Sequence, residues 1–286
     1  MLSLHTNAAA LSAQNAISKT QQNLSMSMTR LSTGYRVNSA MDDAAGLRIA
    51  TRLKAQTSGM ATAARNTQNS ISLLQTAEGS FDEVNNMLVR MKDLATQSAD
   101  ASSTDDDRVA LQAEYDALGL ELANIMKNTT FGGQILLEGG TVAAAMDFQI
   151  GASSAEKMTI DLSTDMTQLT ATDLTAVTSN YTTAATGAEV TTQGAASTII
   201  DVINTAIDSV GKVRSALGAA ANRLDHVATN LANVSTNTKN ATGRIMDVDF
   251  ASESAAMTSN QMLLQAGTAM LKQSNSQSSL VLSLLQ

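Results

Sequence analysis

The sequence predicts a mainly α-helical protein, built as a long antiparallel helical hairpin or coiled-coil bundle with a small β-hairpin region and a short variable outer segment. The first observation is a heptad pattern over residues 199–248, where every position at alternating steps of four and three is apolar except Thr238. The second is composition, because the 286 residues contain no proline and only 2% aromatics. The third is order, because helical patterns flank a non-helical middle and so bring the two termini together.

The predicted helix over residues 199–248 needs partner helices of similar length to cover its apolar seam. A spacing that averages 3.5 residues keeps one apolar seam facing a partner helix along its whole length. Fifty residues of helix span roughly 75 Å, which exceeds the diameter of an ordinary compact domain. We therefore expect partner helices of similar length, in the same chain or in another.

Composition and charge exclude several classes of protein. The absence of cysteine removes disulfides, thiolate chemistry and zinc–cysteine sites. A net charge of −8 argues against a nucleic-acid partner. No apolar run approaches the roughly 20 residues that span a bilayer, so we expect no membrane partner. The N-terminus lacks a basic region followed by an apolar core, so we expect no cleavable signal of the usual kind.

The two ends of the chain are apolar at helical spacing yet almost uncharged. Lys19 is the only formal charge in residues 1–29, and Lys272 is the only one in residues 254–286. Surface helices normally carry a charged face, so we expect these ends to pack together and against other copies. Disordered termini are the alternative. The predicted subunit-packing residues are Leu4, Leu11, Ile17, Leu24, Leu31, Leu263, Met270, Val281 and Leu284.

The remaining helices have recognisable start signals. Asp42 and Asp43 precede a helical pattern predicted over residues 44–99, where they can cap the helix or stabilise its positive N-terminal end. Thr104 and Asp107 form a capping-box pattern before a third heptad over residues 111–125. A glycine-containing stretch, residues 128–133, then ends the helix.

The helical pattern is interrupted in the middle of the chain, over residues 134–194. Residues 134–137, 147–150 and 158–162 are predicted as short strands, and residues 163–194 are rich in Thr and Ala, with weak periodicity and the least order. We expect terminal helices, residues 1–40 with 250–286, to form an inner core domain. Residues 41–162 with 196–249 are predicted to form a bundle with a small β region at about 134–162, and residues 163–195 a variable surface segment.

The sequence shows no catalytic or metal constellation. His5 and His226 lie on helical segments without a nearby ligand pattern. Residues 105–107 are consecutive aspartates, but they lack the spacing of a calcium loop and are better explained as helix-capping charges. We expect no enzyme activity, no cofactor and no metal.

Four stretches resemble one family, bacterial flagellin. Residues 31–50, LSTGYRVNSAMDDAAGLRIA, resemble its N-terminal signature. Three C-terminal stretches are similar to its other hallmarks: RIMDVDFA at 244–251, QMLLQAGTAML at 261–271 and VLSLLQ at 281–286. The resemblance covers about residues 1–140 and 197–286, and the opening and short middle look most like lateral-type flagellins. The family often has a proline before the last stretch, and its absence here predicts an unbroken terminal helix.

The resemblance implies a secreted, extracellular subunit of the flagellar filament, a helical polymer that serves motility. It implies that the end helices form inner tubes and that subunits leave the cell through a specialised export channel. The implied partners are other flagellin subunits, an export chaperone, the hook-junction proteins and the filament cap. The heptads alone also fit an intracellular coiled-coil adaptor or signalling rod, although the charged flanking positions that would select its partners are sparse.

The resemblance also implies a receptor contact. Residues 89–96 together with Glu114 resemble the patch through which many flagellins bind the innate receptor Toll-like receptor 5, and Arg90, Leu94 and Glu114 match the family's positions. Arg90 and Leu94 are four residues apart and are expected to share a face away from the seam of Leu88 and Met91. An ordinary contact between subunits is an equal explanation of these residues.

Overall fold

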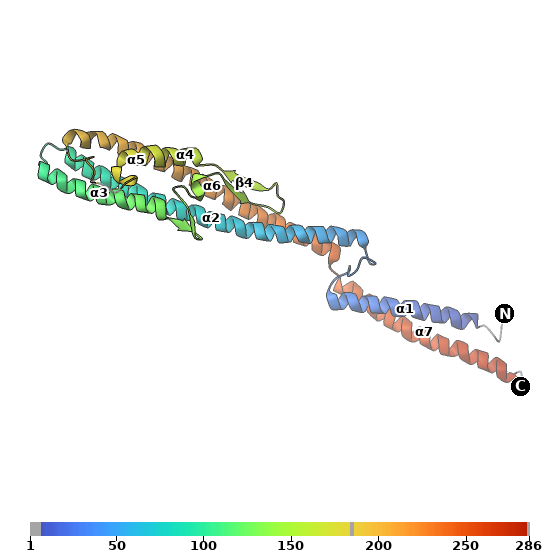
Figure 1. Ribbon diagram of the computed structural model, residues 1–286. Helices are drawn as coiled ribbons and strands as arrows, with labels where there is room; N and C mark the ends of the chain where they lie inside the picture. Colours follow the sequence, from blue (N-terminus) through green and yellow to red (C-terminus); the bar gives the residue numbers. More distant parts are fainter. Residues whose placement is uncertain (1–6, 184–185, 285–286) are drawn as a thin grey trace. The chain divides into compact units, whose positions relative to one another are not determined.

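The computed structural model describes residues 7–183 and 186–284, with side chains described to residue 276 (Figure 1). The chain divides into two compact units. The terminal unit comprises residues 1–57 and 236–286, and the central unit comprises residues 58–235. Two long helices, α2 (Ala44–Ala99) and α6 (Gln193–Met246), contribute residues to both units.

The terminal unit contains the helices α1 (Ala8–Thr33) and α7 (Phe250–Leu284), which lie side by side (Figure 1). They are antiparallel, because the side-chain amide of Asn7 donates to the carbonyl of Ser274 at 3.3 Å, while Arg30 lies 3.6 Å from Glu253. Asn7 caps α1 by accepting the amide hydrogen of Ala10. Gly34 ends α1 with φ +76, the left-handed conformation in which a glycine commonly ends a helix.

The central unit is built on α2, α3 (Asp105–Asn128) and α6. The Ser98 hydroxyl donates to the carbonyl of Val190, and Arg214 lies 2.9 Å from Asp82, so α2 and α6 run antiparallel. The predicted start of α2 at residue 44 and the capping box of Thr104 and Asp107 are confirmed. The α6 seam is fully buried over its first eight predicted positions: Ile199, Ile203, Ala206, Val210, Val213, Leu217, Ala220 and Leu224.

The described chain has two small antiparallel sheets. Strands β1 (Thr130–Phe131) and β2 (Gln134–Ile135) pair around Gly132 and Gly133, whose φ angles of +59 and +84 suit a two-residue hairpin turn. Strands β3 (Met146–Gln149) and β4 (Lys157–Ile160) pair with Met146 opposite Ile160. The three predicted strands correspond to β2, β3 and β4. Strand β1 was not predicted, because its residues lie in the stretch 128–133 that was expected only to end the preceding helix.

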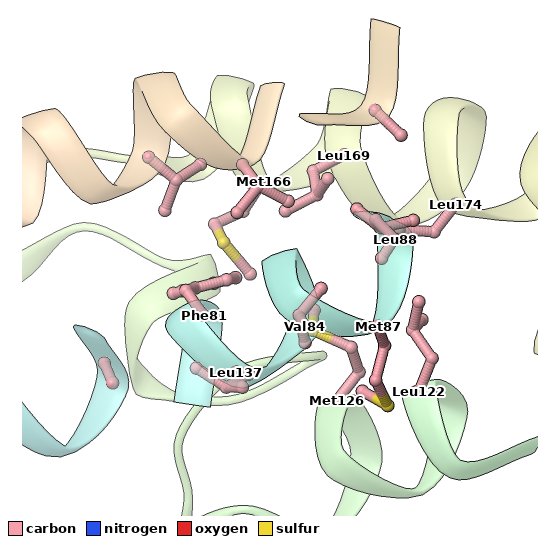
Figure 2. Packing of buried hydrophobic residues seen from close by; sticks show 14 of the residues in the cluster. Phe81, Val84, Met87, Leu88, Leu122, Met126, Leu137, Met166, Leu169 and Leu174 are labelled. Atoms are coloured by element: carbon pink, nitrogen blue, oxygen red, sulfur yellow. The ribbon is translucent and has the colours of Figure 1, made fainter. Parts of the chain in front are cut away.

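The expectation of weak order over residues 163–194 is wrong for the described part of that segment. It forms α4 (Ser163–Thr167), the π-helical turn η2 (Gln168–Asp173), α5 (Leu174–Val177), the 3₁₀ turn η3 (Ser179–Tyr181), and the first residues of α6. Figure 2 shows Met166, Leu169 and Leu174 in one cluster with Phe81 and Leu88 of α2. A π-helix adds a residue to the turn, which breaks the steps of three and four that a heptad search detects.

Hydrogen bonds between helix α3 and the segment that precedes α6 hold that segment in place. The Tyr115 hydroxyl donates to the carbonyl of Val177 at 2.7 Å, and the Lys127 ammonium donates to the carbonyl of Tyr181 at 2.7 Å. Gln112 accepts the amide hydrogen of Val190 at 2.7 Å. Burial raises the pKa of Tyr115, so its hydroxyl remains a protonated donor. These bonds pair backbone groups of the segment with side chains of α3.

Two mid-helix glycines allow this docking to be tested. A Cβ at Gly119 of α3 would lie 2.6 Å from the hydroxyl oxygen of Thr178. The Thr178 residue is fully buried. A Cβ at Gly79 of α2 would meet nothing within 4 Å. We expect Gly119→Ala to lower the free energy of unfolding by about 1–3 kcal/mol through overpacking. The control, Gly79→Ala, is expected to raise it by about 0.5–1 kcal/mol. Urea unfolding measures both, and equal stabilisation by the two substitutions would contradict the docking.

Candidate assembly surface

The α1–α7 pair buries very little of itself. In α1 only Leu24 and Ser27 are buried, and no described side chain of α7 is buried. Lys19, Arg30, Glu253 and Lys272 are the only charged residues of the pair. Its large apolar side chains that stay exposed are Leu11, Met26, Met28, Phe250, Met262, Leu263 and Met270. Two helices of this composition leave an apolar surface open, which is typical of a surface that another molecule covers.

The side chains between α1 and α7 follow heptad spacing on both helices. Gly267 allows close approach, because a Cβ there would lie 2.9 Å from Cγ1 of Ile17. The partly or fully buried positions are Ala10, Ala13, Ile17, Thr20, Leu24, Ser27, Arg30 and Leu31 on α1, and, among the described side chains of α7, Glu253, Met257, Asn260, Leu264, Gly267, Leu271 and Ser274. More than half of these residues are small, polar or charged, so the seam gives the pair little apolar burial of its own.

The predicted subunit-packing residues divide into two groups. Ile17, Leu24 and Leu31 lie on the seam between α1 and α7. Leu11, Leu263 and Met270 are instead exposed, by 51%, 56% and 69%. Leu4 lies outside the described residues, and the side chains of Val281 and Leu284 lie outside the described side chains.

The sequence prediction missed the seam residues Leu264 and Leu271. Each directly follows an apolar residue, Leu263 or Met270, so two registers of α7 are equally apolar in sequence. Only the structure separates the register that faces α1 from the one that faces outward.

Residues 34–43 join α1 to α2 through a tightly bonded loop in the terminal unit. The backbones of Tyr35 and Asp247 form an antiparallel bridge, and Arg36 donates from its backbone to Met246 and from its guanidinium to Ile245. Asp43 caps α2 by accepting the amide hydrogen of Gly46 at 2.8 Å, as predicted. These contacts fix where α1 leaves the rest of the terminal unit.

Asp42 accepts hydrogen bonds from the loop and does not cap α2, so of the two predicted aspartates Asp43 alone supplies the cap. Its Oδ2 accepts the amide hydrogens of Ser39 at 2.8 Å and Asn38 at 3.0 Å. These two backbone bonds, with a further one from the Ser39 hydroxyl, hold the pKa of Asp42 below its ordinary value of 3.8. The carboxylate therefore stabilises the loop fully above that value. This stabilisation is lost as the pH falls through the lowered pKa.

The titration of Asp42 tests this arrangement. We expect the ¹³C signal of its carboxyl group to titrate with a midpoint below 3.8 in the folded chain. In Ser39→Ala the midpoint is expected to rise, because one donor is lost while the two backbone donors remain. An unchanged midpoint in Ser39→Ala, or a wild-type midpoint above the ordinary value, would exclude the described hydrogen bonds.

The matched receptor residues do not share one exposed face. The Arg90 guanidinium donates from Nε to Oε1 of Glu114 at 2.9 Å, and both side chains are about half exposed. Leu94 is only 1% exposed and belongs to the core cluster. The expectation that Leu94 lies on a face with Arg90 is therefore wrong. In the core cluster the buried face of α2 includes Leu88, Met91, Leu94 and Ala95, which is wider than one heptad seam.

The described part of the chain contains neither a cluster of metal-binding side chains nor a helix that could span a membrane. Among residues 7–183 and 186–284, no cluster of three His, Asp or Glu side chains is arranged to hold a metal ion. In the same residues, no helix combines the length and the apolar character needed to cross a bilayer.

The fold and the exposed helix pair define a helical protein whose terminal helices lack a core of their own. Two protein-family models match its sequence. The model of the bacterial flagellin N-terminal helical region matches residues 4–142, and the model of the bacterial flagellin C-terminal helical region matches residues 200–285. The chain belongs to the bacterial flagellin family, which is a family of structural proteins. The matched ranges agree with the predicted extent of the resemblance and leave out the same middle.

Individual relatives support the assignment. The chain is 47% identical over 166 residues to polar flagellin F of Vibrio parahaemolyticus, covering 58% of this chain and 44% of the relative. It is 46% identical over 172 residues to the B-type flagellin of Pseudomonas aeruginosa, covering 59% and 34%. The matches thus span less than half the length of these relatives. The resemblance to lateral-type flagellins stays a prediction.

A solved structure shares the fold. It is described as that of a flagellar hook-associated protein from Vibrio parahaemolyticus, with a TM-score of 0.57, 16% sequence identity, and coverage of 72% of this chain and 100% of that one. At this identity the likeness concerns the fold alone.

Proposed function

We propose that this chain is an extracellular structural subunit that polymerises through its terminal helices into the helical flagellar filament and serves motility. One observation carries the proposal: almost no described side chain of the 26-residue α1 and the 35-residue α7 is buried, and the two helices carry almost no charge. Most of the stability of a helix in a protein comes from packing of its apolar face, and the seam between α1 and α7 buries little, so these two helices gain their stability from neighbouring copies. Family membership supports the same conclusion, and it leaves the coiled-coil adaptor without support.

The proposed organisation assigns each part of the chain a place. Residues 1–40 with 250–286 form the inner core of the filament, and residues 41–162 with 196–249 form the bundle around it. Residues 163–195 form a surface segment, which is anchored to the bundle by its buried side chains. Further partners proposed from the resemblance are an export chaperone, the hook-junction proteins and the filament cap.

Negative-stain electron microscopy of the purified chain tests the function. Under polymerising conditions we expect long filaments of uniform width from the full chain alone. The dilute protein before polymerisation serves as the control and should show no filaments. A protein that stays monomeric, or that forms only amorphous aggregates, would contradict the proposal.

We also propose that Arg90 and Glu114 form part of a contact for Toll-like receptor 5. Because this ion pair is exposed, Arg90→Ala is expected to change the free energy of unfolding by less than about 1 kcal/mol. We expect it to weaken binding of the subunit to the receptor ectodomain at least tenfold, measured by surface plasmon resonance. Leu94→Ala serves as the contrast, since loss of a buried leucine destabilises by about 2–5 kcal/mol. Wild-type affinity in Arg90→Ala would exclude the contact.

A further inference from the structure

The methionines of this chain are distributed very unevenly between its two units. All seven in the central unit are buried, none above 6% exposed: Met60, Met87, Met91, Met126, Met146, Met158 and Met166. Five in the terminal unit are exposed, from 41% for Met26 to 97% for Met41: Met26, Met28, Met41, Met262 and Met270. Met246 and Met257 are partly buried, and Met1 lies outside the described residues.

Four of the five exposed methionines lie on the terminal helices that the proposed function buries. Met26 and Met28 are on α1, Met262 and Met270 are on α7, and Met41 is in the loop between α1 and α2. Among the described side chains of α1 and α7, they make up four of the seven large apolar ones that remain exposed. Methionine side chains, each with a thioether sulfur, therefore supply a large share of the exposed apolar surface on these helices.

A thioether in water can be oxidised by a peroxide. The sulfur attacks one peroxide oxygen, a sulfur–oxygen bond forms as the oxygen–oxygen bond breaks, and the second oxygen leaves as water after proton transfer. The sulfur loses two electrons and the peroxide gains them. The product sulfoxide is polar and is reduced again by methionine sulfoxide reductases. A sulfoxide buried without a donor opposes the packing that the thioether favoured.

We propose that Met26, Met28, Met41, Met262 and Met270 are peroxide-sensitive modification sites of the free subunit, and that their sulfoxidation blocks polymerisation while the central unit stays folded. This inference rests on the proposed function, because it assumes that the terminal helices pack against other copies. It adds a reversible chemical control to that assembly. The seven buried methionines provide an internal reference within the same chain.

Treatment of the full-length monomer with hydrogen peroxide tests the inference. After the peroxide is removed with catalase, we expect peptide mass mapping to find sulfoxide at the five exposed sites and not at the seven buried ones. The sedimentable polymer should fall at least tenfold relative to untreated protein, while the thermal unfolding of the central unit is unchanged. Methionine sulfoxide reductase should restore polymerisation.

Two further arms separate the possible outcomes. Untreated protein is the baseline, and its failure to polymerise would overturn the proposed function rather than the oxidation step. The variant with all five exposed methionines replaced by leucine keeps apolar side chains of similar size, so its polymerisation should resist peroxide. Wild-type protein that polymerises normally with the five sulfoxides present would overturn the inference. So would polymerisation that stays blocked after the reductase has removed the sulfoxides.

Discussion

Deletion of residues 250–286 is expected to abolish filament growth while the central unit still folds. Helix α1 would lose α7, which it contacts from Asn7 at one end to Arg30 at the other. The buried core cluster, in contrast, runs from Ile71 to Leu224 and contains no residue of the deleted segment. Sedimentation and electron microscopy should detect no filaments, and thermal unfolding followed by circular dichroism should retain the transition of the central unit.

The reciprocal deletion, residues 1–33, is the matched test because it removes the other member of the same pair. We expect the same loss of filaments and the same retained transition. Filaments of normal length from either shortened chain would show that the terminal helices are not the assembly surface. Loss of the central transition would show that the two units depend on each other for folding.

Phe81→Ala is expected to destabilise the central unit by about 3–5 kcal/mol, because it leaves a large cavity. Phe81 is fully buried, and Figure 2 shows it in the cluster with Met166 and Leu137. Phe81 therefore packs α2 into a cluster with Met166 of α4 and with Leu137, which lies between β2 and β3. Urea unfolding monitored by circular dichroism measures the change.

Phe250→Ala is the matched control for this substitution. Phe250 begins α7, belongs to the terminal unit and is 56% exposed. We expect its replacement to change the unfolding of the central unit by no more than about 0.5 kcal/mol. Similar effects of the two substitutions would show that Phe81 does not hold the core together.

The sequence was sufficient where a regular period or a local capping signal defined the structure. The seam of α6, the start of α2 and the capping box of α3 follow from apolar spacing and from side chains that pair with the nearest backbone amides. The flagellin signature at residues 31–50 also has a local explanation. Asp42 and Asp43 bond the loop and the first turn of α2, and Gly46 leaves room for the Asp43 carboxylate.

Sequence reasoning failed where tertiary contacts decided the outcome. The buried face of α2 is wider than one seam, so Leu94 is in the core although it follows Arg90 by one helical turn. Residues 163–183 gain their order from contacts with distant helices, such as the bond from Tyr115 to Val177, and a π-helical turn conceals their spacing. Adjacent apolar residues on α7 left its register undetermined.

Hydrogen exchange of α1 and α7, in the dilute subunit and in the filament, measures most directly whether the ends need other copies. We expect their amides to exchange at least a hundredfold faster in the dilute subunit than in the filament, while buried amides of α3 exchange slowly in both. Terminal helices as well protected in the dilute subunit as α3 would show that they are already stable without neighbours.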